Sequence, residues 1–167
     1  MKTKEEKLRN LVAFVNMLER SGIHKFNLDN FISRLRLQKY VYLARFFGFD
    51  LGYVYNLYLR GPYSPDLAED YYRLKERSKW EDLLIPIINF DKFAKLVRGK
   101  DHRWLEIATT IHFVWESNRN WRERYRKPFK DLKTFVINRT SDIKSHVGKR
   151  FIEGVFVELE KAGLLEN

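Results

Sequence analysis

Hydrophobic residues recur at helical spacing along most of this chain. Over Lys4–Ser21 they fall three or four positions apart, which predicts an amphipathic helix that stops at Gly22. A second helix is predicted over Phe31–Phe47. Its part from Leu35 onward is apolar nearly all round, as expected for a central buried helix.

The period changes to two over Tyr53–Leu59, where aromatic and β-branched residues predict a short strand. Arg60–Tyr63 is predicted to break that strand. Ser64 is then expected to cap a helix that begins at Pro65 and runs to about Arg77.

A lone strand cannot satisfy its own backbone groups, so a partner strand is required. The candidates are Leu83–Ile88, the tail after Gly163, or the same strand in a second chain of a homodimer.

Further helical segments are predicted downstream, separated by proline, glycine and polar residues. They are Glu81–Leu84, Phe90–Val97, Arg103–Ser117, Pro128–Asn138 and Lys144–Ala162, with a break at Thr140–Asp142. The sequence therefore predicts one mainly α domain over residues 1–167, a helical bundle with a short strand or hairpin. Within it, 1–99 and 100–167 are candidate sub-lobes.

Composition narrows the choice of functional class. The chain has 167 residues, 44% of them hydrophobic, which is enough for a core. It contains no cysteine, which excludes disulfides, thiolate metal sites and a catalytic thiol. The charged N-terminus is unlike a signal peptide and no apolar run could span a bilayer, so we expect a cytoplasmic protein. The formal net charge of +10 favours an acidic partner: nucleic acid, an acidic protein or an anionic membrane surface. Of these we expect nucleic acid or a protein, and no membrane.

Half of that net charge lies within Arg119–Lys133, where seven basic residues stand against two acidic ones. Trp121, Tyr125 and Phe129 interleave with them. Cations beside an aromatic ridge suit nucleic acid, through phosphate pairing and base stacking, but the same spacing also serves a helix that faces a core. Both interpretations stay open. The residues predicted here to contact nucleic acid are Arg119, Arg122, Arg124, Arg126, Lys127 and Lys130.

The last segment has a helix–turn–helix pattern. A helix ending near Asn138, a polar turn through Ser145 and a helix over Val147–Ala162 would suit the helical part of a winged helix, with no room left for a wing hairpin. The same arrangement is also common as a plain packing unit. The basic residues expected at the start of its recognition helix are Lys144, Lys149 and Arg150.

Metal-binding patterns are missing from the sequence. The four histidines lack partners at i, i+4, and His112 is expected to be a hydrogen-bonded core residue. Asp66 and Asp70 lie near a predicted helix N-terminus, where they stabilise the dipole. We therefore expect no metal and no cofactor.

Two short patterns in the sequence resemble nuclease motifs, and neither supports a nuclease. Pro65–Asp66 and Asp131–Lys133 together resemble a restriction-nuclease string, but that motif needs strands and both pieces are predicted to be helical. Arg139 and His146 have the spacing of the pair in helical HEPN ribonucleases, a match that chance alone would supply about once in this composition. We expect a protein that is not an enzyme.

The segment Arg60–Pro65 is the most unusual local feature, because a strand passes directly into a helix N-terminus there. Helix N-termini bind anions, whereas the simpler interpretation is a rigid turn. The candidate partner-binding residues are Arg60, Tyr63 and Ser64.

Two motifs in this part of the chain carry a family resemblance. Arg36–Ala44 (RLQKYVYLA) and Tyr58–Pro65 (YLRGPYSP), followed by Leu67, resemble the YwgA-type proteins. These are similar in turn to the Panacea antitoxin domain, which shares an LQK and GPxxP pattern. Panacea domains act as antitoxins or proteolytic adaptors by binding a toxin. The resemblance therefore implies, as the alternative function, a protein-binding module that uses the GPYSP region.

Overall fold

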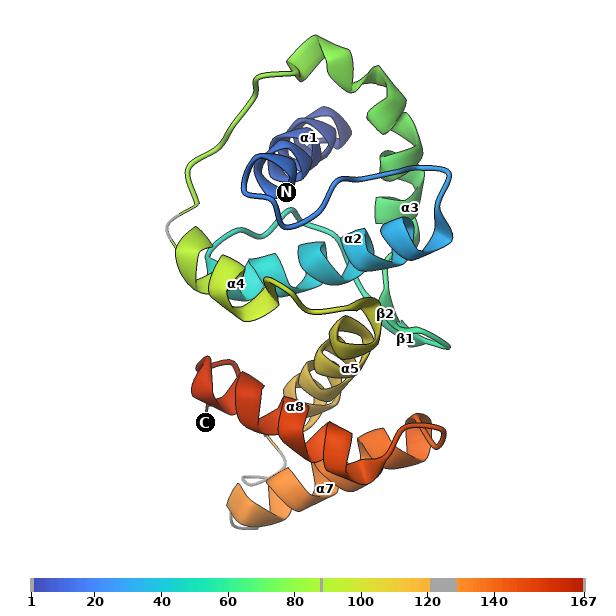
Figure 1. Ribbon diagram of the computed structural model, residues 1–167, viewed down its shortest axis with the longest axis vertical. Coiled ribbons are helices and arrows are strands. Elements are labelled where there is room, and N and C mark those ends of the chain that lie inside the picture. Colours follow the sequence, from blue (N-terminus) through green and yellow to red (C-terminus); the bar gives the residue numbers. More distant parts are fainter. Residues whose placement is uncertain (1, 88, 121–128, 167) are drawn as a thin grey trace.

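The computed structural model describes residues 2–87, 89–120 and 129–166. It is mainly helical, with one small antiparallel sheet among the described residues, so the predicted fold class is confirmed (Figure 1). In chain order its elements are α1 (Lys4–Arg20), α2 (Phe31–Ala44), η1 (Arg45–Phe47), β1 (Asn56–Tyr58), β2 (Gly61–Tyr63), α3 (Pro65–Tyr72), η2 (Arg73–Trp80), α4 (Phe90–Val97), α5 (His102–Asn118), α7 (Phe129–Ile143) and α8 (Lys149–Lys161).

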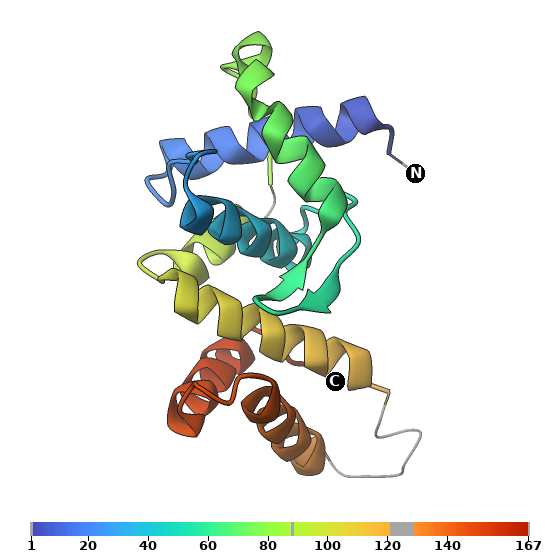
Figure 2. The ribbon, with the colours of Figure 1, turned by 90° about the vertical axis from the view of Figure 1, so that its right-hand side faces the viewer.

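Helix α5 occupies the middle of the molecule. It packs against α2 and strand β2 on one side and against α7 and α8 on the other (Figures 1 and 2). One hydrophobic cluster runs from Leu11 on α1 through Trp115 on α5 to Leu159 on α8. The two candidate sub-lobes thus share one continuous core.

The local sequence explains where several helices begin. Thr3 and Glu6 form a reciprocal capping box at the start of α1, and the Asp101 carboxylate accepts from the Trp104 backbone N–H at 2.9 Å at the start of α5. Ser64 caps α3 and Pro65 occupies its first turn, as predicted. These caps satisfy backbone donors that would otherwise have no partner.

The strand partner differs from all three candidates. β1 pairs with β2 immediately after it, in a hairpin with Asn56 opposite Tyr63 and Tyr58 opposite Gly61. β1 ends before Arg60, as predicted, but the chain turns back at Leu59–Arg60 and Gly61–Tyr63 forms the second strand. The reason is Gly61, whose φ of +87° lies in the left-handed region that permits so tight a return. Neither Leu83–Ile88 nor a second chain is needed to satisfy β1.

Several predicted helices also differ from the structure. α2 ends at Ala44, where the 3-10 helix η1 follows, and α8 begins at Lys149 instead of Lys144. α3 ends at Tyr72 and continues as the 3-10 helix η2, and Glu81–Leu84 is not helical. α7 runs through the predicted break at Thr140–Asp142, because Thr140 and Lys144 are buried on the face that carries the core residue Val136. Tertiary packing overrides the weak helix propensity there.

Residues 144–148 connect α7 to α8, and the two helices pack against each other. Residues 162–166 after α8 form a turn with no strand. The winged-helix interpretation of this segment stays a prediction.

Candidate functional site

The two motifs that carry the family resemblance lie against each other. The Gln38 side chain holds the backbone of Ser64 from both sides: its Nε2 donates to the Ser64 carbonyl at 2.9 Å, and the Ser64 N–H donates to its Oε1 at 3.0 Å. The Lys39 Nζ donates to the Pro62 carbonyl at 2.6 Å. The LQK motif on α2 therefore fixes the path of the GPYSP segment.

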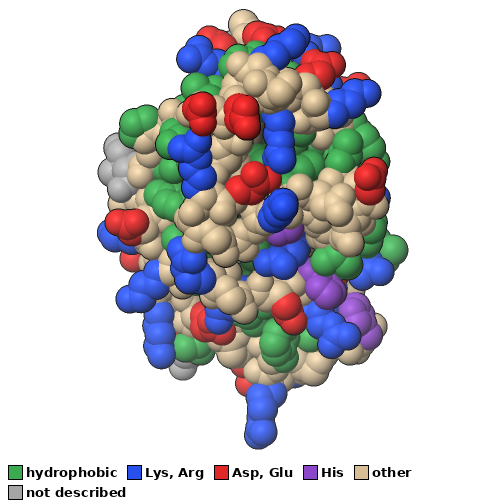
Figure 3. Space-filling view, turned by 45° about the horizontal axis from the view of Figure 1, so that its top comes forward, with side chains coloured by type: hydrophobic (Ala, Val, Ile, Leu, Met, Phe, Trp, Pro, Cys, Tyr) green, Lys and Arg blue, Asp and Glu red, His purple; other side chains and the backbone are tan. Residues whose placement is uncertain are grey.

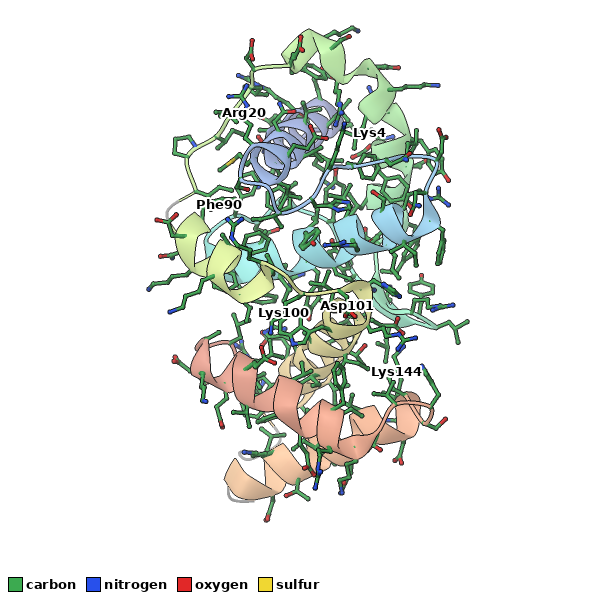
Figure 4. All side chains as sticks on the ribbon, in the orientation of Figure 1. Lys4, Arg20, Phe90, Lys100, Asp101 and Lys144 are labelled. Atoms are coloured by element: carbon green, nitrogen blue, oxygen red, sulfur yellow. The ribbon has the colours of Figure 1, made fainter. Side chains whose placement is uncertain are left out.

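A second buried lysine holds the other end of the hairpin turn. Lys144, at the end of α7, donates from its Nζ to the Leu59 carbonyl at 2.7 Å and to Glu106 Oε1 at 2.6 Å. Figure 4 shows Lys144 between the hairpin and the α7–α8 turn. The hairpin is thus tied to α2 by Lys39 and to α5 and α7 by the Glu106–Lys144 ion pair.

These three buried charges act on one another. Burial lowers the pKa of Lys39 to about 7; the Glu106 carboxylate opposes this shift and the Lys144 ammonium adds to it. The Glu106 carboxylate thus forms an ion pair with Lys144 and also favours the charged form of Lys39, and both lysines are fully buried. Such a cluster is costly to desolvate and is retained where the position of its neighbours matters.

Gly61 completes this arrangement. A Cβ at this position would lie 2.9 Å from Thr110 Oγ1 and 3.3 Å from the Lys39 Nζ. The glycine therefore allows both the left-handed turn and the close approach of the hairpin to α5.

A pocket of about 480 Å³ lies where the hairpin turn, the start of α5 and the α7–α8 turn meet. We call it the cationic pocket. Its lining residues are Arg60, His102, Arg103, Glu106, Ile107, His146, Val147, Gly148 and Phe151. Figure 3 shows histidine and basic side chains gathered on the right-hand part of the face it draws.

The charges around the cationic pocket favour an anion. Arg60 and Arg103 come from the hairpin and from α5, and among the described lining residues Glu106 is the one carboxylate. That carboxylate is already paired with Lys144. Gly148 precedes α8, whose first turn receives no cap from a described side chain, so its backbone N–H groups add to the positive potential.

A second hollow lies on the other side of the hairpin turn. It is about 390 Å³ in size, and we call it the aromatic groove. It is lined by Phe31, Arg34, Leu35, Gln38, Tyr58, Leu59, Arg60, Gly61, Tyr63, Tyr71 and Tyr72. Arg60 lines both hollows, so the side chain of one exposed residue separates the cationic pocket from the aromatic groove.

The predicted site residues near the hairpin divide into exposed and buried ones. Arg60 is exposed and Tyr63 is half-buried in the aromatic groove. Ser64 is fully buried, where its hydroxyl accepts from the Leu67 N–H, so the prediction that it contacts a partner is corrected: it is a helix cap.

The predicted recognition-helix residues divide in the same way. Lys149 and Arg150 are exposed in the first turn of α8, beside the cationic pocket. Lys144 is 1% exposed and ion-paired, so it cannot reach a phosphate and its predicted contact with nucleic acid is corrected. Its role is to anchor the hairpin.

Most of the predicted basic segment lies outside the described residues. This holds for Arg122, Arg124, Arg126 and Lys127 with the aromatic residues among them, and the side chain of Lys130 is likewise not described. Arg119 is exposed and lies 3.4 Å from Glu116, a surface pair that is easily exchanged for another anion. The contacts predicted for this segment stay predictions.

The histidines fall into two groups. His112 is buried, and the Tyr42 hydroxyl lies 2.9 Å from its Nδ1, which confirms the predicted core histidine. His102 and His146 face the cationic pocket, and Arg139 is not among the residues that line it. Within the described ranges, no three metal-binding side chains are grouped closely enough to hold an ion.

Sequence reasoning missed most of the cationic pocket. His102 and Arg103 carried no motif, and their neighbourhood with Arg60 arises only from the packing of α5 against the hairpin. Lys39 lay inside the LQK motif, and a lysine in the middle of a predicted buried helix is a sign of a buried partner.

A scan against protein-family models, a search of curated proteins and a search of solved structures each find no match for this chain. Of the helices in the described ranges, none combines the length and the apolar character that a membrane span requires.

Proposed function

We propose that this protein binds nucleic acid without catalysis and that the cationic pocket holds a backbone phosphate. The observation that carries the proposal is the convergence of Arg60, Arg103 and the uncapped start of α8 on one hollow. A guanidinium group can donate two parallel hydrogen bonds to the oxygens of one phosphate, and a helix N-terminus adds backbone N–H donors.

The setting of the pocket supports a macromolecular ligand rather than a small one. The pocket opens beside Lys149 and Arg150, which are exposed and extend the positive surface along α8. The formal net charge of +10 provides a long-range attraction for a polyanion. The basic segment Arg119–Lys133 then offers further phosphate contacts to the same ligand.

The test is a salt titration of binding to a fluorescent oligonucleotide, with an Arg60→Ala/Arg103→Ala variant. Each lost arginine should weaken binding at least about tenfold at low salt. Together they should reduce the slope of log K against log salt by about 0.7 for a single strand, since both arginines contact the same phosphate and each neutralised phosphate contributes about 0.7.

Lys92→Ala/Lys95→Ala is the matched control. It also removes two exposed charges, but from α4, on the opposite side of the molecule from the hairpin in Figure 1. Equal weakening of oligonucleotide binding by both variants would show that affinity depends on net charge alone. It would refute a phosphate site in the cationic pocket. Cleavage of RNA by the wild-type protein that His146→Ala abolishes would refute the non-catalytic part of the proposal.

A second candidate function follows from the most exposed large hydrophobic residue in the described part of the chain. Leu59, at the hairpin turn, is 89% exposed and lies beside the half-exposed Tyr58. An exposed apolar patch is a mark of protein docking, which agrees with the Panacea-like resemblance. Co-purification of the product of an adjacent gene, lost on Leu59→Ser and retained in Arg103→Ala, would favour this candidate over nucleic acid.

A further inference from the structure

We infer that the nucleic acid is single-stranded and that its unpaired bases enter the aromatic groove, next to the phosphate held in the cationic pocket. This inference rests on the proposed function and names the class of its ligand.

The aromatic groove presents aromatic side chains to solvent. Phe31 is 52% exposed, Tyr58 47% and Tyr72 52%. The Tyr58 and Tyr63 rings are 5.4 Å apart in an edge-to-face pair, so one ring steadies the other across the hairpin. Exposed aromatic rings on a steadied backbone are the usual platform for base stacking.

The charges around the aromatic groove indicate which kind of ligand it suits. Arg34 and Arg60 approach the Phe31 ring, with their guanidinium carbons 6.0 and 5.9 Å from its centroid. None of the described residues that line the groove is a carboxylate. A ligand with flat rings and negative charge therefore fits better than an apolar peptide, and nucleotides combine the two.

The geometry places ring and phosphate sites next to each other. Arg60 lines both hollows, and the carbonyls on either side of it in the turn, those of Leu59 and Pro62, are held by Lys144 and Lys39. The border between groove and pocket is thus fixed by buried contacts. A strand crossing Arg60 would place a base on one side and a phosphate on the other.

A duplex does not fit this arrangement. Its bases stack on one another and show only their edges in the grooves, so their faces cannot reach Phe31 or Tyr58 without unpairing. An unpaired strand exposes base faces at no such cost.

The experiment compares three oligonucleotides of about 12 nucleotides, a length within the range that single-strand modules cover. They are a thymidine strand, its duplex and an abasic strand with the same phosphates. We expect the thymidine strand to bind more tightly than the other two. Phe31→Ala and Tyr58→Ala should each weaken its binding about 5- to 150-fold and leave the abasic strand unchanged.

Leu84→Ala is the control, because Leu84 is 45% exposed and lies outside the groove. Photo-cross-linking of a 5-iodouracil strand gives a readout on the wild-type protein, with attachment expected at Phe31, Tyr58 or Tyr72. Equal affinity for thymidine and abasic strands, or for single strand and duplex, would overturn the inference while leaving nucleic-acid binding intact.

Two further outcomes separate the claims. Absence of binding to all three oligonucleotides would refute the proposed function itself. If Phe31→Ala and Tyr58→Ala released a protein partner but left the thymidine strand bound as tightly as before, the groove would be a protein-docking site and the inference would be wrong.

Discussion

Lys144 and Glu106 form an ion pair that water barely reaches, with side chains 1% and 9% exposed. Removing one member of such a pair leaves the other charge buried without compensation, whereas replacing both with apolar groups removes the desolvation cost as well. The buried pair therefore matters most for where the hairpin lies, since Lys144 also holds the Leu59 carbonyl.

The first prediction concerns that pair. Lys144→Met should lower the free energy of unfolding by about 3–5 kcal/mol, and Lys144→Met/Glu106→Leu should recover part of the loss. The recovery is partial because Lys39 loses the Glu106 carboxylate and the Leu59 carbonyl loses its donor. Urea denaturation at pH 8 measures both. The control is Arg20→Met, which breaks the exposed Arg20–Asp82 pair and should cost less than about 1 kcal/mol. A double variant no more stable than Lys144→Met would contradict the assignment.

A second residue-scale prediction concerns acid stability. Burial, with Arg45 nearby, lowers the pKa of His112 to about 3, and burial, with Arg36 nearby, lowers that of His24 to about 4. Unfolded histidines titrate near 6.5, so between about pH 6.5 and 4 the unfolded state binds two more protons than the folded state. Stability is then full above pH 6.5 and falls as pH drops.

The loss should amount to about 1.4 kcal/mol per pH unit for His112, and to less for His24, which is only partly buried and is screened by solvent. Denaturation midpoints measured from pH 7 to 4 check this. His112→Gln should lower stability at pH 7 yet remove its share of the slope. An unchanged slope in that variant would mean that the buried ring is not the group responsible.

The β1–β2 hairpin is the element on which both hollows depend. It is short, and an isolated two-stranded hairpin is marginal in water. Here α2 and the end of α7 each supply a buried hydrogen bond to it, through Lys39 and Lys144, and α5 supplies the Glu106 carboxylate that pairs with Lys144. Gly61 lets it come close enough for these contacts to form.

The third prediction tests that close approach. Gly61→Ala should cost about 2–5 kcal/mol, because it adds left-handed strain and a contact with Thr110 Oγ1. Adding Thr110→Ala to Gly61→Ala should restore only part of the lost stability. It removes the contact with Oγ1 but leaves the left-handed backbone strain at position 61. Gly154→Ala on α8 is the control: it meets open space and should stabilise the helix slightly. Thermal unfolding ranks the variants, and full rescue would show that sterics alone were at work.

Periodicity predicted the helices well where their polar and apolar faces were distinct, as in α1 and α4. It failed where tertiary contacts decided the outcome. The partner of β1 depended on one glycine conformation, and the end of α7 on the burial of Thr140 and Lys144. Lys144 was assigned to a nucleic-acid surface because sequence alone shows its charge and not Glu106 beside it.

At the scale of the whole molecule, two groups of basic residues are candidates for contact with nucleic acid. One surrounds the cationic pocket and the start of α8, and the other is the segment Arg119–Lys133. Arg119 lies at the end of α5, which packs against both α7 and α8 (Figure 2). A single strand long enough could contact both.

The last prediction tests whether one ligand uses both regions. Arg122→Ala/Arg124→Ala/Arg126→Ala should weaken binding of a long single strand and lower its salt slope by about 2, at about 0.7 for each phosphate contact. A strand too short to span both regions binds to one region at a time. With such a strand, the triple variant and Arg60→Ala/Arg103→Ala should not both weaken binding. With the long strand their effects should combine, since each region then holds a different part of the same ligand. A triple variant with wild-type affinity and slope on the long strand would confine nucleic-acid binding to the pocket and leave the aromatic residues of the segment to serve the core.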